Sequence, residues 1–155
     1  MKIRRWICIL LVCTTMVGSV VLPTMAMRQP GETVVWLDDL EWEWIDLSTV
    51  EHQEASTLLR ARVSADGTYS AHSIHTITQP VSLQARSTVT FNCSYSPSSA
   101  SMDFGVIAPD GKFYYVNVKG GSINQPIRVN QTGNYSVAIR NNSSQTVSVV
   151  GFVEY

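Results

Sequence analysis

Three tryptophans interleaved with acidic residues are the part of this sequence with the clearest potential for chemistry. Trp36, Trp42 and Trp44 lie between Glu32 and Glu54, a stretch with eight acids and no lysine or arginine. Aromatic faces on a rigid scaffold can stack on sugar rings, and tryptophan is enriched at the energetic centres of protein interfaces. The pattern therefore predicts a ligand-binding surface for a glycan or a protein. The alternative is that the three rings only fill the edge and core of the fold.

Cys93 is the single cysteine of the chain beyond the N-terminal leader described below. It alternates in phase with Val89, Phe91 and Tyr95, which places it on an apolar face, where cysteine behaves as a small hydrophobe. A catalytic thiol needs an exposed, electropositive setting that lowers its pKa, and no glycine-flanked cysteine motif surrounds Cys93. We expect a core thiol, with an intermolecular disulfide and a nucleophile as the alternatives.

The remaining histidines and acids form no recognisable catalytic or metal-binding pattern. His72 and His75 are three residues apart, which on a strand places them on opposite faces, and no acid or thiol is close to them in the sequence. Of the four acids after residue 57, Asp66 and Asp110 precede turn glycines, so no convincing carboxylate pair of the glycosidase kind is left. We expect no catalytic residue, no metal and no cofactor. A hydrolase is the distant alternative.

Residues 1–26 have the pattern of a helical secretory signal peptide. A basic start precedes an apolar run from Ile7 to Leu22, about 16 residues, whereas a helix that spans a bilayer needs about 20. Small side chains then precede a cleavage site that we place between Ala26 and Met27. The leader predicts a secreted protein, extracellular or at the cell surface. An uncleaved leader that anchors the chain in a membrane is the alternative.

The chain beyond Ala26 would contain 129 residues with a net charge of about −4, enough for one domain. This weakly negative net charge argues against a protein whose function is to bind nucleic acid or anionic membranes. With one cysteine left, a disulfide framework within the chain is impossible, so stability must come from an apolar core.

From residue 57 onward the sequence alternates apolar and polar residues with a period of two, again and again. This period makes each strand buried on one side and wet on the other. About eight such runs, separated by turns such as Pro109–Gly111, predict an all-β fold, an antiparallel β-sandwich of the jelly-roll or Ig-like kind. Three regions result: the signal peptide (1–26), the acidic tryptophan-rich segment (27–56) and the sandwich (57–155).

The acidic segment itself fits two secondary structures. Leu40, Trp42 and Trp44 alternate with acids, which is a strand pattern, whereas Trp36, Leu40, Trp44 and Leu47 also fit a helical stripe. We favour an extended strand that covers an edge of the sandwich.

Five asparagines stand in the Asn-x-Ser/Thr pattern of N-glycosylation, at positions 92, 130, 134, 141 and 142. The pattern suits a eukaryotic secretory pathway. We favour a simpler account, in which Asn, Ser and Thr coincide because they are concentrated in turns and on the wet faces of strands.

Residues 102–155 resemble the bacterial pre-peptidase C-terminal domain, a jelly-roll-like β-sandwich appended to secreted bacterial enzymes. The matching pieces are the strand and Pro-Asp-Gly turn over Met102–Gly111 and the Thr-Gly-Asn-Tyr run that begins at Thr132. The family often has two acids before the turn, suited to calcium, whereas only Asp103 stands there in this chain. The chain also resembles small uncharacterised secreted proteins of Gram-positive bacteria, which implies a location but no activity.

Taken together, the sequence predicts a secreted, non-catalytic β-sandwich that binds a glycan or a protein outside the cell through the Trp36, Trp42 and Trp44 region. The alternative is a structural or assembly role, in which an exposed strand edge pairs with another copy of the chain or with a secreted enzyme.

Overall fold

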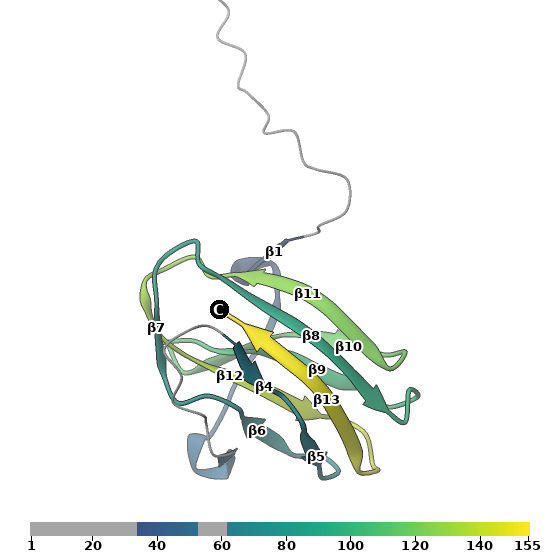
Figure 1. Cartoon of the computed structure of the whole chain (residues 1–155). Helices are drawn as coiled ribbons and strands as arrows, with labels where there is room; N and C mark the ends of the chain where they lie inside the picture. The colour runs from purple at the N-terminus through teal and green to yellow at the C-terminus, as the bar shows by residue number, and fades with distance from the viewer. Residues whose placement is uncertain (1–33, 53–61) are drawn as a thin grey trace, which may run out of the picture. The chain divides into compact units, whose positions relative to one another are not determined.

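The two-residue alternation of the sequence folds into two sheets that pack face to face (Figure 1). The computed structural model describes residues 34–52 and 62–155, and these ranges contain thirteen strands and two short 3-10 turns. The predicted all-β sandwich is therefore confirmed. In chain order the elements are β1 (Val35–Trp36), η1 (Leu37–Asp39), β2 (Glu41–Trp44), η2 (Leu47–Thr49), β3 (Glu51–His52), β4 (Arg62–Ser64), β5 (Gly67–Tyr69), β6 (Ile74–Thr76), β7 (Val81–Leu83), β8 (Thr88–Ser96), β9 (Met102–Ile107), β10 (Lys112–Val118), β11 (Ser122–Arg128), β12 (Gly133–Asn141) and β13 (Val147–Glu154).

One sheet has the strand order β1-β11-β8-β13-β4, with β5 also paired to β13. The other has the order β2-β10-β9-β12-β6-β3, with β7 also paired to β12. All pairings are antiparallel except β1 with β11 and β3 with β6, which are parallel and involve two residues each. The long strands β8 to β13 therefore form the body of the sandwich, and the short strands lie at its edges or beside them.

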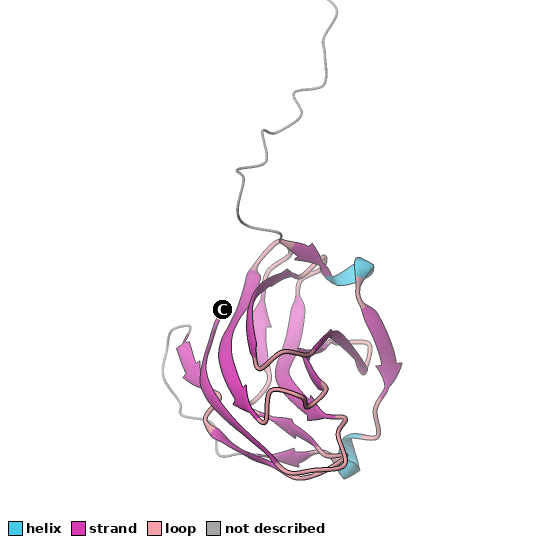
Figure 2. Cartoon of the chain, turned by 90° about the vertical axis from the view of Figure 1, so that its right-hand side faces the viewer, coloured by secondary structure: helices cyan, strands magenta, loops and turns pink. Residues whose placement is uncertain are grey.

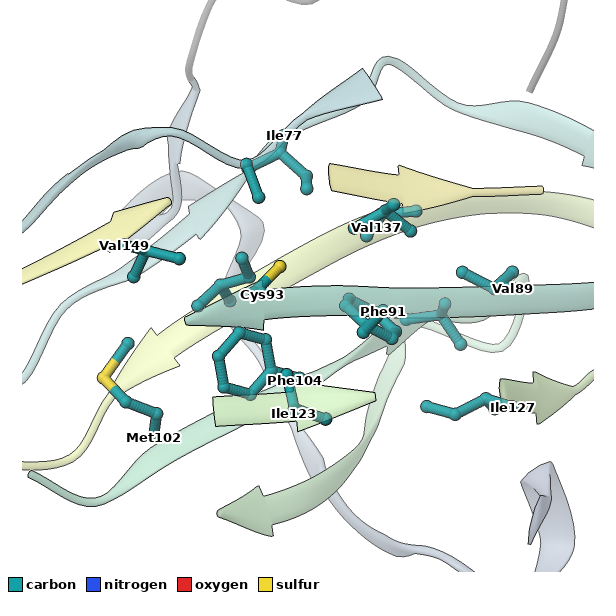
Figure 3. Close-up of a cluster of buried hydrophobic side chains, with 14 of the residues drawn as sticks. Ile77, Val89, Phe91, Cys93, Met102, Phe104, Ile123, Ile127, Val137 and Val149 are labelled. Carbon is teal, nitrogen blue, oxygen red and sulfur yellow. The ribbon is translucent and has the colours of Figure 1, made fainter. Parts of the chain in front are cut away.

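The core lies between the sheets and is built from the alternating apolar side chains of both. β8 buries Val89, Phe91, Cys93 and Tyr95, while the intervening residues of the same strand face outward. Figure 3 shows residues of this core from both sheets pointing toward one another, with Phe91 and Phe104 at the centre of the view. Burial of such side chains from water is the main term that stabilises the fold.

Gly151 in β13 is required by close packing against β8. Its φ of 148° is one that side-chain-bearing residues rarely adopt, and a Cβ at this position would lie 2.3 Å from the backbone oxygen of Asn92. Gly151 therefore adds no side chain to the core, whereas Val149 and Val153, which are in phase with it on β13, are both buried.

The count of about eight strands was too low for a physical reason. Each of the eight predicted runs contains a strand, and the five additional strands, β1, β2, β3, β5 and β6, are two to four residues long. β1, β3, β5 and β6 are two or three residues long, too short to show a period, whereas β2 was predicted separately as the extended edge strand of the acidic segment.

The acidic segment runs along one side of the sandwich and joins both sheets. β1 forms the edge of one sheet, η1 turns the chain, and β2 forms the edge of the other (Figure 2). Leu37 in η1 is buried in the core, so it closes the gap between the two edges. The predicted extended edge strand is confirmed, and the alternative helical stripe is wrong.

Beyond β2 the segment packs on the outer face of its sheet. Ile45 contacts a second apolar cluster formed by Ile107, Phe113 and Ala138, whose side chains lie on the side opposite to the core. This cover helps to bury Ile107 of β9, a strand whose residues are all buried, on both faces. β3 then pairs with β6 at the far edge of the same sheet.

Residues 1–33 and 53–61 lie outside the described ranges. The predictions of a signal peptide and of a cleavage site between Ala26 and Met27 fall on them and stay predictions. Within the described ranges, none of the helical turns has the length or apolar character needed to cross a membrane.

Candidate functional site

Trp42 and Trp44 are brought to the surface by their position on an edge strand. β2 pairs with the first half of β10, with Trp42 opposite Tyr114 and Trp44 opposite Lys112. Because side chains alternate along a strand, both rings lie on one face and Glu41 and Glu43 on the other. The two tryptophans are 49% and 68% exposed. They lie on the side of the sheet that faces the core, but beyond the edge of the core itself.

Lys112 links the two tryptophan rings. Its Nζ atom lies 3.8 Å from the centroid of the Trp42 ring and 5.3 Å from that of Trp44, distances at which a cation is attracted to an aromatic face. The same ammonium group lies 3.8 Å from Oδ2 of Asp110. The edge strand therefore places a cation and a carboxylate beside two indoles.

Asp110 is held in place by the turn between β9 and β10. Its Oδ1 atom accepts a hydrogen bond from the backbone nitrogen of Lys112 at 3.1 Å, and its Oδ2 atom accepts one from the Tyr114 hydroxyl at 2.8 Å. Burial, reinforced by Asp110, raises the pKa of Tyr114 to about 12, so the phenol stays protonated as a donor. Gly111, with a φ of 79°, allows the tight reversal beneath Trp44.

We refer to Trp42, Trp44, Asp110, Lys112 and Tyr114 as the tryptophan edge. Two of the three residues predicted from the sequence, Trp42 and Trp44, belong to it. Asp110, Lys112 and Tyr114 were missed as site residues, because they are about seventy positions away in the sequence and only strand pairing brings them to the tryptophans.

Trp36 belongs to a different edge. It lies in β1 at the end of the other sheet, and its ring contacts the guanidinium of Arg128, which is 5.3 Å from the ring centroid. It is 39% exposed. The three predicted tryptophans thus lie on edge strands of two different sheets, and none of them is a core residue. The core position in this segment is taken by Leu37.

A network of buried polar groups lies on the outer face of the same sheet. Asp103 of β9 has no exposed surface, and its Oδ2 atom accepts a hydrogen bond from Nε of Arg140 at 2.7 Å and forms an ion pair with Nη2 at 2.6 Å. Asn117 donates to Oδ1 at 2.6 Å and Asn142 to Oδ2 at 2.5 Å. Arg140 also pairs with Glu43 of β2. The network therefore ties the edge strand to the centre of its sheet.

Burial governs the titration of this network. It raises the pKa of Asp103, against the lowering effect of the hydrogen bonds from Asn117 and Asn142, and it lowers the pKa of Arg140. The guanidinium also lies over the rings of Tyr115 and Phe113, at 4.7 and 5.5 Å from their centroids. A signal for this pair was present in the sequence, because Asp103 and Arg140 each interrupt an apolar strand.

The Asp103 carboxylate is thus engaged by an arginine and two amides at the position where the resembled family often has acids suited to calcium. In the ranges 34–52 and 62–155, no group of three or more His, Cys, Asp or Glu side chains is placed to hold a metal ion.

The histidines do not converge. His72 is an exposed turn residue with a φ of 54°, whereas His75 is half-buried in β6. Nε2 of His75 lies 3.0 Å from the Ser73 hydroxyl and 3.3 Å from a carboxylate oxygen of Glu51, and its ring packs against that of Tyr69. Glu51 is distant from His75 in the sequence and comes beside it because β3, which carries Glu51, pairs with β6.

Cys93 is the core thiol that the alternation predicted. It is 3% exposed, and its sulfur approaches the backbone oxygen of Phe152 at 3.7 Å. Burial raises the pKa of the thiol to about 11, which disfavours the thiolate that a nucleophile or metal ligand requires.

Two of the asparagines in the glycosylation pattern, Asn141 and Asn142, form hydrogen bonds that stabilise the fold. The Asn141 side chain is fully buried and donates to the backbone oxygens of Tyr69, Ser70 and Gln145 at 2.7 to 3.0 Å. Asn142 donates to Asp103, as described above. Modification of either nitrogen would remove these bonds, which supports the view that their sequence pattern is coincidental.

The fold and the geometry thus define an all-β sandwich with an aromatic edge strand. No family model, no curated protein and no solved structure matches the chain. The resemblance of residues 102–155 to the pre-peptidase C-terminal domain stays a prediction.

Proposed function

We propose that this chain is a secreted, non-catalytic binding module that contacts a glycan or a protein outside the cell through its tryptophan edge. The observation that supports the proposal most directly is the exposure of two neighbouring indoles, Trp42 and Trp44, on a strand fixed to a rigid sheet. Secretion rests on the leader pattern of residues 1–26.

The chemistry of the tryptophan edge suits recognition better than reaction. Large aromatic side chains bury much apolar area on contact with a ligand, and they are enriched among residues that dominate binding energy. Lys112, Asp110 and the Tyr114 hydroxyl lie beside the rings and can exchange hydrogen bonds with a polar ligand. A few polar groups next to an apolar surface are the usual source of orientation and specificity.

Three acids and the thiol of the described sandwich have structural partners, which favours a non-catalytic role over a hydrolase. Asp103 accepts a hydrogen bond from Arg140, and Asp110 accepts hydrogen bonds from the backbone of Lys112 and the hydroxyl of Tyr114. Asp66 accepts a hydrogen bond from the backbone nitrogen of Gly151 at 2.7 Å. Carboxylates engaged in this way are poorly suited to act as a general acid or nucleophile, which must face a substrate.

A second candidate function is assembly through a strand edge. Among the described strands, β2 pairs only with β10, so its other side is available to a further strand. In this case the partner is another protein chain and the contact is made mainly by the backbone.

Fluorescence of the exposed tryptophans tests the proposal. Titration with cell-wall polysaccharides and with proteins captured from the native culture medium should quench or shift the emission. Trp44→Ala should weaken the response at least tenfold, whereas Val150→Ala, which alters an apolar side chain 63% exposed on the other sheet, should leave it unchanged. A flat titration with every ligand, or an equal response from the Trp44 variant, would contradict a binding role for this edge.

A further inference from the structure

Building on the proposed function, on which it rests, we propose that the free edge of β2 binds an extended, lysine- and arginine-rich segment of another protein as an added strand. Three properties of the edge lead to this partner: its unpaired backbone, its uncompensated negative charge, and the way it already receives cations from its own fold.

The backbone of β2 is open on one side. All four residues from Glu41 to Trp44 are exposed, and β10 is the only described strand that pairs with them. In an antiparallel pair, alternate residues direct their backbone N–H and C=O groups away from the neighbouring strand. These groups are a template for an incoming strand, which is how extended peptides are bound at many sheet edges.

The charge near this edge selects a basic partner. Residues 34–52 contain six acids and no lysine or arginine. Two of them are paired within the fold, Glu43 with Arg140 and Glu51 with His75. The other four form no ion pair with a basic side chain of the described ranges: Asp38, Asp39, Glu41 and Asp46.

The same charge argues against a second copy of the chain as the partner. Pairing of two β2 strands would bring Glu41 and Glu43 of one copy beside the acids of the other, and like charges on adjacent strands are destabilising. A basic strand from a different protein would instead be attracted before contact and paired after it.

β2 already receives cations from its own fold on both faces. On the tryptophan face, Lys112 lies opposite Trp44 and contacts both rings. On the acidic face, Arg140 of β12 extends past β9 and β10 to pair with Glu43. A lysine or arginine that arrives on the free side of β2 finds the same two kinds of group, an exposed indole and a carboxylate.

Peptide binding measured by fluorescence anisotropy tests this inference. The probe is a dye-labelled, end-capped ten-residue peptide of alternating lysine and valine. It should bind, and its affinity should fall as salt screens the charges. A glutamate-valine peptide of the same pattern should bind at least tenfold more weakly. So should a lysine-valine peptide with all backbone nitrogens methylated, because it keeps its charge but donates no backbone hydrogen bond.

Variants of the protein localise the contact. Glu41→Lys and Trp44→Ala should each weaken binding of the lysine-valine peptide at least tenfold, and the matched Val150→Ala should not. Equal binding of the methylated peptide, or no binding by protein that is folded by circular dichroism, would overturn the inference. If the peptide fails but a polysaccharide still quenches the tryptophans, the added strand is wrong and the proposed function stands. If the peptide, the polysaccharides and the proteins captured from the culture medium all fail, both are wrong.

Discussion

β2 and β8 have the same alternation of side chains, yet they use their apolar faces in opposite ways. β8 lies between β11 and β13 and buries Val89, Phe91 and Cys93 against the opposite sheet. Among the strands of residues 34–52 and 62–155, β2 has a neighbour on one side only, and it leaves Trp42 and Trp44 exposed. Alternation therefore identifies a strand, but the position of the strand in its sheet decides whether the apolar face forms core or contact surface.

The largest expected effect separates a core ring from an edge ring. Phe104 is fully buried, with its ring centroid 5.9 Å from that of Phe91 and 6.1 Å from that of Tyr95. Phe104→Ala should lower the free energy of unfolding by about 3 to 5 kcal/mol, because it removes apolar contacts and leaves a cavity. Trp44→Ala should change it by less than about 1 kcal/mol, as exposed positions do. Urea unfolding of both variants measures the difference.

The contrast between a core ring and an edge ring is wrong if Phe104→Ala and Trp44→Ala lower the free energy of unfolding by similar amounts. A large loss from Trp44→Ala would mean that the indole stabilises the fold, and the exposed edge would then need no ligand to explain it. Val150→Ala provides the baseline, since Val150 is equally exposed but has no cation over it.

The next effect concerns the network that ties β2 to the sheet. Arg140→Met removes the partner of Glu43 and leaves the buried Asp103 carboxylate with only its two amide donors. Breaking one half of a buried ion pair typically costs about 3 kcal/mol or more. We expect a loss of about 3 kcal/mol in urea unfolding, together with a change in native tryptophan emission as β2 loosens.

A double variant shows whether the loss comes from the orphaned charge. Asp103→Leu combined with Arg140→Met should recover much of the stability, because two apolar side chains replace the pair without leaving a charge buried. Arg62→Met is the matched control on the other sheet, where the arginine is exposed and lies over Phe152. If the double variant is as unstable as Arg140→Met alone, the orphaned carboxylate is not the cause.

The eight long alternating runs were predictable because each one repeats its period over enough residues. The run 88–95 carries its burial pattern in the sequence, and the structure buries the residues of its apolar phase. The short strands β1, β3, β5 and β6 could not be predicted, since two or three residues carry no period and are extended only because a longer strand pairs with them.

The candidate site was predictable only in part, for a different reason. Trp42 and Trp44 are conspicuous in the sequence, but Lys112 and Asp110 reach them through the register of β2 with β10. Register depends on tertiary packing, which no local pattern specifies. Trp36 shows the converse. It is near Trp42 in the sequence, yet η1 separates the two residues and they lie on edge strands of different sheets.

The smallest expected effect is at the far edge, where β3 pairs with β6 and places Glu51 beside His75. Burial lowers the pKa of His75, and the attraction of Glu51 opposes this shift only in part. The folded protein therefore binds a proton at His75 less readily than the unfolded chain does. Consequently, the free energy of unfolding should fall as the pH drops below the ordinary histidine pKa of about 6.5 and level off above it.

Urea unfolding between about pH 5.5 and 8 measures this slope, and His75→Gln should flatten it while keeping a side chain that can hydrogen-bond to Ser73. His72→Gln is the control, because His72 is exposed in the preceding turn. A slope of the opposite sign would mean that the ion pair with Glu51 outweighs burial, and that β3 is held to the sheet by charge. The far edge would then resemble β2, which is tied to its sheet by Glu43 and Arg140, more closely than it resembles the core.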